Sequence, residues 1–214
     1  MPLKAFDKKY WSQDVKLLAG VDEAGRGPLA GPVVAAAVIF NKSITIKGVN
    51  DSKQLTEIQR EKLYKKIINR ALSFSVSIVD APVIDEINIL NATMLAMKQS
   101  INNLTIKPDL ILVDGNRKFQ SDIPVVPIVK GDTKSFSIAA ASILAKVTRD
   151  RIMKNLAQDY PQYLWEKNKG YATREHREII LKHGPCPLHR NTFLKKLLSG
   201  QQVFDFSDIQ EEID

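Results

Sequence analysis

The sequence lacks the features that mark a secreted or membrane protein. One of its 214 residues is a cysteine, Cys186, so an internal disulfide cannot form. No apolar run reaches the length of a membrane span. The first residues, MPLKAFDKKYWSQD, have no apolar core of the kind found in a secretory signal. These absences predict a cytoplasmic protein that does not enter the membrane.

The sequence also has few residues that could bind zinc. There are three histidines, and Cys186 and His189 form an isolated Cys-x-x-His pair in a proline-rich loop. A structural zinc site takes four ligands. We therefore favour the interpretation that these two residues belong to an ordinary loop over the interpretation that they bind a metal. Internal repeats and low-complexity tracts are absent from the sequence as well, which favours an ordinary globular domain.

Charge is the first positive signal. Lys and Arg number 31 against 24 Asp and Glu, for a net charge of +7 and a sequence pI near 9.4. This balance favours an anionic partner such as nucleic acid, although many soluble proteins carry a modest excess of basic residues. Hydrophobic residues make up 44%, enough to build the core of one large domain. A monomer is the default expectation.

Hydrophobic patterning predicts an α/β fold, a mixed sheet of about five strands flanked by helices. We expect a domain at 1–160, a helical extension at 161–200 and a flexible acidic tail at 201–214. The first two strands, joined by a short link, should pair antiparallel. Thr56 and Ser135 are placed to cap helices. The predicted strands are 15–21, 33–40, 74–79, 110–113 and 125–129, and the predicted helices are 56–71, 82–104, 135–160, 173–183 and 190–198.

Acidic residues stand where three of the predicted strands end. Asp22 and Glu23 follow the first, Asp114 ends LILVD, and Asp132 comes after PIVKG. Each acid alone is well explained as a turn residue. In α/β sheets, however, ligands gather beyond strand ends, and clustered carboxylates repel one another unless a cation lies among them. Together the four acids predict a site for Mg²⁺ or Mn²⁺, ions that serve in pairs for water attack at phosphorus.

The acid pair raises a geometric problem. Successive side chains of a regular strand face opposite sides, so we expect the strand to break at Glu23, or Glu23 to contribute its backbone carbonyl as well as its side chain. The next residues, Gly25-Arg26-Gly27, predict a loop that contacts a ligand, because glycine permits close approach and arginine pairs with phosphate. A tight hairpin with an exposed arginine explains the same residues equally well.

Six segments, in this order, resemble bacterial ribonuclease HII, the type 2 ribonuclease H. They are GVDEAGRGPLAGPVVAAAV from residue 20, DSKQL at 51–55, LVDGN around Asp114, KGDTKSFSIAAASILAKVTRD at 130–150, KGYATREH at 169–176 and HRNTF at 189–193. The set spans nearly the whole chain and is highly specific. The type 3 enzyme has an additional N-terminal domain, and the roughly twenty residues before Asp22 make that reading the weaker one.

The resemblance implies a ribonuclease H-like fold with a C-terminal helical extension that binds substrate. It implies a metal-dependent endonuclease that cuts the RNA strand of RNA–DNA hybrids and incises 5′ of a single ribonucleotide in duplex DNA, leaving 3′-hydroxyl and 5′-phosphate ends. Such incision begins the removal of misincorporated ribonucleotides. The catalytic and metal-binding roles fall on Asp22, Glu23, Asp114 and Asp132, with two Mg²⁺ or Mn²⁺ ions as cofactors.

The resemblance also assigns substrate contacts. Gly25-Arg26-Gly27 corresponds to a loop that senses the ribose 2′-hydroxyl, and Tyr171 to a tyrosine that stacks on the sugar next to the RNA–DNA junction. Without the resemblance, Tyr171 would be read as a surface aromatic. Basic side chains would hold phosphates without reading the base sequence, although a solvated helix face explains each one equally well. These candidates are Lys53, Lys146, Arg149 and Arg190, with Lys134, Lys167, Lys169 and Arg174 as further members.

Two rival functions and one partner are also open. A non-catalytic hybrid-binding module would keep the basic surface, have no need of four acids, and bind regardless of Mg²⁺. A different metal-dependent phosphotransferase would share the acids and ignore a 2′-hydroxyl. In the tail, QQVFDFSD (201–208) has a glutamine followed by Phe-x-Phe, which suggests docking on a sliding clamp. A loose acidic end explains the same residues at least as well.

Overall fold

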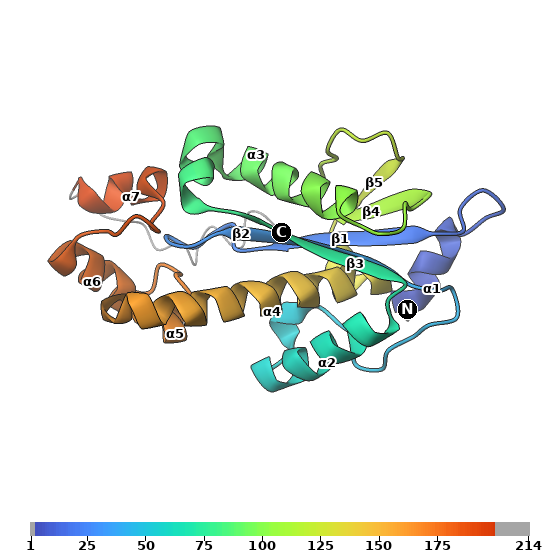
Figure 1. Cartoon of the computed structure of the whole chain (residues 1–214), viewed down its shortest axis with the longest axis horizontal. Helices are drawn as coiled ribbons and strands as arrows, with labels where there is room; N and C mark the ends of the chain where they lie inside the picture. Colours follow the sequence, from blue (N-terminus) through green and yellow to red (C-terminus); the bar gives the residue numbers. More distant parts are fainter. Residues whose placement is uncertain (1–2, 200–214) are drawn as a thin grey trace.

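The structure is a computed structural model that describes residues 3–199 (Figure 1). The predicted acidic tail, with its candidate clamp-binding segment at 201–208, lies outside the described residues. In the part of the chain that is described, no helix has both the length and the apolar character needed to span a membrane.

Five strands form one mixed sheet in the order β3-β2-β1-β4-β5. β1 pairs antiparallel with β2, and β2 with β3, whereas β1 and β4, and β4 and β5, are parallel. The predicted mixed sheet and its antiparallel first pair are therefore confirmed. The strands are β1 (Leu18–Ala24), β2 (Val33–Ile39), β3 (Ser73–Val79), β4 (Leu110–Asp114) and β5 (Val125–Ile128).

Two long helices cover opposite faces of the sheet (Figure 1). α3 (Ala81–Asn102) packs on one face, α4 (Phe136–Asp159) on the other, and α2 (Glu57–Arg70) lies outside α4. The alanines of α4 let it approach closely, as the small residues of this segment predict. At Gly20 the approach is so close that a Cβ atom would lie 2.1 Å from the carbonyl carbon of Ser137.

Both predicted helix caps are present. At α2, Thr56 Oγ1 accepts from the Gln59 N–H at 3.3 Å, and Gln59 Oε1 accepts from the Thr56 N–H at 2.8 Å. At α4, Ser135 Oγ accepts from the Ile138 N–H at 3.2 Å and donates to Asp7 at 2.6 Å. Asp7 ends α1 (Leu3–Asp7), a helix too short to show periodicity in the sequence and therefore not predicted.

The structure corrects two predicted elements. β1 does not end or break at Glu23; the ladder continues, with Glu23 opposite Ala35 and Ala24 opposite Val34. The long helix α3 is not continuous, because Asn88 has φ 66° and ψ 163°. The Asn88 side chain accepts from the Asn91 N–H at 3.1 Å and so caps the second segment of the helix.

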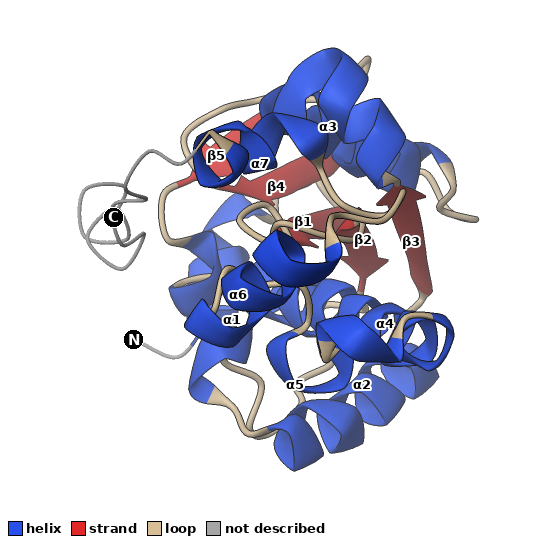
Figure 2. Cartoon of the chain, turned by 90° about the vertical axis from the view of Figure 1, so that its left-hand side faces the viewer, coloured by secondary structure: helices blue, strands red, loops and turns tan. Residues whose placement is uncertain are grey.

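The C-terminal helices form a lobe at one end of the molecule, seen end-on in Figure 2. They are α5 (Trp165–Asn168), α6 (Arg174–His183) and α7 (Asn191–Leu198). The lobe has its own buried cluster, which includes Trp165, Tyr163 and Ile180 together with Leu29 from the β1–β2 connection. This shared cluster holds the lobe against the loop that follows Asp22 and Glu23.

Candidate active site

The sheet topology brings the predicted acids to one edge. β1, β4 and β5 run parallel, so their carboxyl ends lie together, and Asp132 follows β5 in a short 3₁₀ turn, Gly131–Thr133. Val21 pairs with Val113, so the next residues, Asp22 and Asp114, stand side by side and face the same side of the sheet. Asp22 is 5% exposed.

Burial raises the pKa of each of the four carboxyls, and repulsion from neighbouring acids adds to the shift at Asp22, Glu23 and Asp132. The pKa of Asp22 is raised well above its usual range, first by burial and then by Asp114, Glu23 and Asp132. Burial also raises the pKa of Asp114, against the effect of the Gly131 N–H, which donates to its carboxylate at 2.6 Å. The pKa of Asp132 rises to about 6 through burial, Asp114 and Asp51, with Lys53 opposing. The acids therefore lie close enough to act on one another.

Glu23 turns toward the neighbouring loop. Its pKa is raised by burial, while Arg26 opposes the shift, with Arg26 Nη1 at 3.4 Å from Glu23 Oε1. β1 continues through Glu23, so the backbone is not broken at this residue. The Glu23 side chain alone turns toward the loop. Glu23 thus connects the acids to Gly25-Arg26-Gly27.

The acids suit a hard divalent cation. In residues 3–199, no three His, Cys, Asp or Glu side chains are arranged to enclose an ion unaided. Mg²⁺ usually keeps several waters and takes one or two carboxylates together with substrate phosphate oxygens, so a complete protein cage is not needed. The donors here are oxygens, and a cation would relieve the repulsion that raises their pKa values. Asp22 and Asp114 are placed to hold it.

Two arginine side chains, Arg149 and Arg190, pack against the backbone of the Gly25-Arg26-Gly27 loop. Gly25 has φ +96°, and a Cβ atom there would lie 2.1 Å from Arg149 Nε, so glycine is required. Gly27 has no atom within 4 Å of an added Cβ, which leaves open space beside it. The Arg190 guanidinium donates to the carbonyl oxygens of Gly25 at 2.6 Å and of Arg26 at 2.8 Å.

The structure corrects the role predicted for two arginines. Arg149 and Arg190 are 0% exposed, so their guanidinium groups cannot reach a phosphate at the surface as predicted. Arg149 donates to the carbonyl oxygens of Pro32, Ala30 and Lys169 at 3.0, 3.1 and 3.0 Å. It therefore ties the β1–β2 connection to the loop before Tyr171, a task for which the planar, multiply donating guanidinium is well suited.

Tyr171 follows a segment that is bonded to the same β1–β2 connection. Its side chain is 40% exposed, and Lys146 Nζ lies 5.5 Å from the ring centroid. Before it, Gly170 has φ +83°, and a Cβ atom there would lie 2.6 Å from the Ala30 carbonyl oxygen. The Leu29 N–H donates to the Gly170 carbonyl oxygen at 2.8 Å. The segment before Tyr171 is thus bonded to Leu29 of the β1–β2 connection, the same connection that begins with Gly25-Arg26-Gly27.

The other basic candidates differ in how they are engaged. Lys53 is exposed and lowers the pKa of Asp114 and Asp132, so it lies near the acids. Lys146 pairs with Asp150 at 2.8 Å. Lys134 and Lys169 each donate to a backbone carbonyl, that of Val129 and that of Glu166. Arg174 pairs with Glu178, and Lys167 is exposed. Of these six basic side chains, Lys53 is the one that the structure places near the acids, in addition to Arg26 beside Glu23.

Sequence reasoning missed two acids that matter here. Asp51 is buried, accepts from the Lys53 N–H at 2.9 Å and raises the pKa of Asp132, and its signal was its place in DSKQL. Asp85 accepts from the N–H groups of Asn191 and Thr192 at 2.7 and 2.9 Å, so it caps α7 directly after Arg190. No local pattern marked Asp85, because its partners lie more than one hundred residues away.

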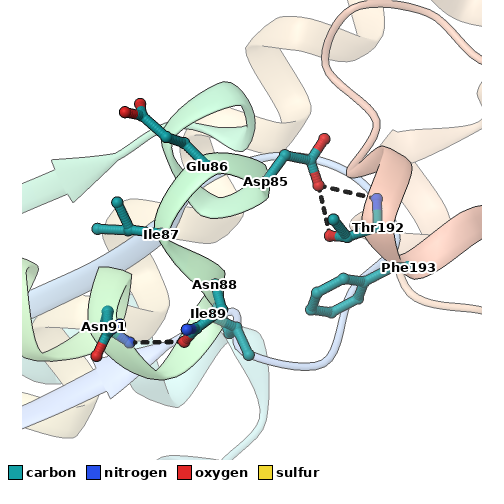
Figure 3. A pocket seen from close by; sticks show the side chains of 8 residues that line it. All are labelled: Asp85, Glu86, Ile87, Asn88, Ile89, Asn91, Thr192 and Phe193. Atoms are coloured by element: carbon teal, nitrogen blue, oxygen red, sulfur yellow. Dashed lines mark hydrogen bonds between the residues drawn. The ribbon is translucent and has the colours of Figure 1, made fainter.

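Asp85 also lines a cavity of about 510 Å³ between α3 and α7 (Figure 3). Phe193 and the break at Asn88 form other parts of its wall. None of the four clustered carboxylates lines it. The cavity is therefore separate from the acid cluster.

The mixed sheet and the helices on its two faces define the ribonuclease H-like class of folds, here with acids gathered at the ends of the parallel strands. The family model described as "Ribonuclease HII" matches residues 19–196. The chain belongs to the ribonuclease HII family, and it is a nuclease.

Relatives and solved structures agree with this assignment. The ribonuclease HII of Caldicellulosiruptor bescii is 54% identical over 193 residues, which cover 90% of this chain and 94% of the relative. The ribonuclease H2 structure from Pyrococcus horikoshii OT3 has a TM-score of 0.72 at 33% identity and covers 86% of this chain and 97% of its own. The PCNA:RNase HII complex from Archaeoglobus fulgidus has a TM-score of 0.69 at 29% identity, with 81% and 93% covered.

Proposed function

We propose that this ribonuclease cleaves the RNA strand of RNA–DNA hybrids and incises duplex DNA on the 5′ side of a single embedded ribonucleotide. The products carry 3′-hydroxyl and 5′-phosphate ends, and the incision begins the removal of misincorporated ribonucleotides. One observation carries the proposal. The buried Asp22 and the half-buried Asp114 lie side by side at the sheet edge where the Gly25-Arg26-Gly27 loop begins. Arg190 ties this loop to the β1–β2 connection, and Arg149 ties the same connection to Lys169, two residues before Tyr171.

The chain's own groups divide the work between chemistry and selection. Asp22, Glu23, Asp114 and Asp132 provide the negatively charged oxygens at the scissile phosphate, and the exposed Lys53 beside them is placed to hold a phosphate. A pair of bound Mg²⁺ or Mn²⁺ ions would supply activation of the attacking water and stabilisation of the leaving oxygen.

The glycine loop is suited to recognising a ribose. The 2′-hydroxyl is both a donor and an acceptor, and it is the group that distinguishes RNA from DNA at a given nucleotide. The open space beside Gly27 lets the sugar approach the backbone, and Arg26, whose side chain is 51% exposed, is available to a phosphate. Tyr171 presents its ring from the adjoining loop, where a deoxyribose offers it a flat apolar face.

The test uses a labelled DNA duplex that carries one ribonucleotide, with an all-DNA duplex as the control. Wild type and Asp22→Asn are incubated with Mg²⁺, Mn²⁺ or a chelator, and the cut is mapped. We expect metal-dependent incision 5′ of the ribonucleotide, absent from the control duplex and from the variant. Cleavage of the all-DNA duplex would indicate a different phosphotransferase, and binding without incision that survives chelation would indicate a binding module.

We also propose a sliding clamp as a partner, with support from one structural neighbour. The Archaeoglobus fulgidus ribonuclease HII was solved in a complex with PCNA. We extend this to residues 201–208 of the present chain, which contain a glutamine and a Phe-x-Phe pattern. Binding of full-length protein to the bacterial sliding clamp, compared with Phe204→Ala/Phe206→Ala, tests the extension. Equal affinity of the two proteins would contradict it.

A further inference from the structure

A chain of hydrogen bonds crosses the C-terminal lobe and ends at the backbone of Tyr171. The Cys186 N–H donates to His189 Nδ1 at 3.0 Å, and His189 Nε2 lies 3.3 Å from His176 Nε2. His176 Nδ1 lies 2.9 Å from the carbonyl oxygen of Tyr171, while Trp165 Nε1 donates to His176 Nε2 at 3.1 Å. Both histidines are fully buried. Neither belongs to the acid cluster.

The partners determine which ring nitrogen carries each proton. An indole N–H can only donate, so His176 Nε2 accepts and the His176 proton is on Nδ1, facing a carbonyl that can only accept. A backbone amide also only donates, so His189 Nδ1 accepts and the His189 proton is on Nε2. His176 Nε2 then receives two donors in a three-centre bond. Every bond in the chain points toward Tyr171.

The burial of the two rings keeps them neutral. Burial lowers the pKa of His176, and burial together with the neighbouring His176 lowers the pKa of His189 to about 4. Protonation of His176 at Nε2 would set that N–H against the N–H groups of Trp165 and His189. The direction of the chain is therefore maintained near neutral pH.

The chain ends at a loop whose backbone is unusual. Lys169 and Gly170 both have positive φ, 49° and 83°. Three successive carbonyls receive donors from three separate parts of the protein: Lys169 from Arg149, Gly170 from the Leu29 N–H, and Tyr171 from His176. The Tyr171 carbonyl also accepts from the nearby Thr173 N–H at 2.9 Å. Of these donors, the His176 ring is the side chain that bonds the residue with the exposed aromatic ring.

We propose that His176 is a positioning residue for substrate selection, because its Nδ1–H fixes the Tyr171 carbonyl and thereby the ring against the sugar beside the ribonucleotide. This rests on the proposed function. A fixed ring stacks on a deoxyribose and is crowded by a 2′-hydroxyl, so it favours a single ribonucleotide followed by DNA over a continuous RNA strand. Loosening the Tyr171 backbone weakens that preference.

Two matched substitutions separate the nitrogens of His176. In His176→Asn the amide nitrogen takes the place of Nδ1 and keeps a donor for Tyr171. In His176→Gln the amide takes the place of Nε2, and the Tyr171 carbonyl loses its ring donor. For each protein, kcat/KM is measured on a duplex with one ribonucleotide and on an all-RNA strand paired with DNA. The first value divided by the second is the ratio compared among the proteins.

We expect His176→Gln to lower this ratio about tenfold, as befits one lost hydrogen bond, in the same direction as Tyr171→Ala. His176→Asn should stay within about twofold of wild type. An equal loss on both substrates in His176→Gln would show a merely structural role and overturn the proposal. An equal fall of the ratio in both variants would also overturn it. If wild type fails to incise the single ribonucleotide, the proposed function fails first, before any variant is compared.

A measurement on the wild-type protein decides the matter if the variants do not fold, which near-UV circular dichroism would show. Long-range ¹⁵N–¹H NMR spectra of the histidine rings report the tautomers. We expect a proton on Nδ1 of His176 and on Nε2 of His189 at pH 7. A proton on Nε2 of His176 would remove the donor to Tyr171 and overturn the proposal.

Discussion

The acid cluster and the loops that hold Tyr171 lie side by side, yet their polar groups are treated in opposite ways. The carboxyl of Asp22 is buried and that of Asp132 half-buried, and burial together with repulsion from other acids raises the pKa of both. Arg149 and Arg190 are fully buried, but the guanidinium group of each donates three hydrogen bonds to backbone carbonyls. The acid cluster is therefore electrostatically unfavourable as it stands, whereas the guanidinium groups that hold the loops have hydrogen-bond partners.

The difference follows from what each region does. A cluster whose charges repel gains free energy when a cation binds, so the cost of holding the acids together becomes affinity for metal. A surface that reads a sugar must keep its geometry before the substrate arrives, because alignment supplied in advance is not lost on binding. On the proposed function, the electrostatic repulsion lies where the chemistry would occur, and the hydrogen-bonded network lies where the substrate would be selected.

Asp22→Asn should give the largest effect and should separate activity from stability. We expect incision to fall about 10³-fold, on the order of 4 kcal/mol in the barrier, because a ligand oxygen loses its charge. The melting temperature without metal should stay the same or rise, because one repelling charge is removed. Initial rates of incision and thermal melts measure the two quantities.

Asp109→Asn is the matched control for that variant. Asp109 is exposed, and hydrogen bonds from the Leu17 and Lys16 N–H groups lower its pKa. We expect unchanged incision and a loss of stability below about 1 kcal/mol. If Asp22→Asn destabilised the protein more than Asp109→Asn, the contrast between strained acids and satisfied groups would be contradicted.

Arg149→Lys should weaken the satisfied region. An ammonium group cannot bridge the three carbonyls that the guanidinium reaches, so buried acceptors lose donors. We expect a loss of about 3 kcal/mol in the free energy of unfolding, measured by urea denaturation. Arg151→Lys, two residues along α4, changes an exposed pair with Glu61 and should cost less than about 0.5 kcal/mol. Equal losses would show that the buried bonds are not special.

The stability of the same region should depend on pH through His189. Its folded pKa is about 4, against an ordinary value of 6.5, so between these pH values the unfolded chain binds more protons. The free energy of unfolding therefore falls as the pH drops from about 6.5 to 4, by up to about 3 kcal/mol for this group. Denaturation curves of wild type and His189→Gln measure it. An identical pH dependence in the variant would contradict the assignment.

Mg²⁺ should produce the smallest of these effects and act on the acids alone. At ten times its dissociation constant, an ion that binds the folded state adds about 1.4 kcal/mol to the free energy of unfolding. We expect Mg²⁺ to raise the melting temperature of wild type and Asp109→Asn, and to leave Asp22→Asn nearly unchanged. Equal stabilisation of all three proteins would place the ion elsewhere.

Local signals predicted much of the fold. Four of the strands are short apolar runs, and in β3 serine alternates with apolar residues. Thr56 and Ser135 cap their helices because capping depends on residues three positions apart. The break at Asn88 was not predicted, since nothing in a helical pattern marks a residue with φ 66°. The end of β1 was misplaced, because polarity at Asp22 and Glu23 looked like the end of a strand that in fact continues.

The sequence by itself determined the chemistry of this protein: four acids that follow apolar strands, a glycine loop with an arginine, and a tyrosine after glycine. Tertiary structure alone decided how they are held. Arg190 reaches Gly25 across 165 positions, and Asp85 reaches Asn191 across 106. Whether a charged side chain faces solvent or backbone carbonyls depends on which distant segments pack around it, and no local pattern of residues carries that information.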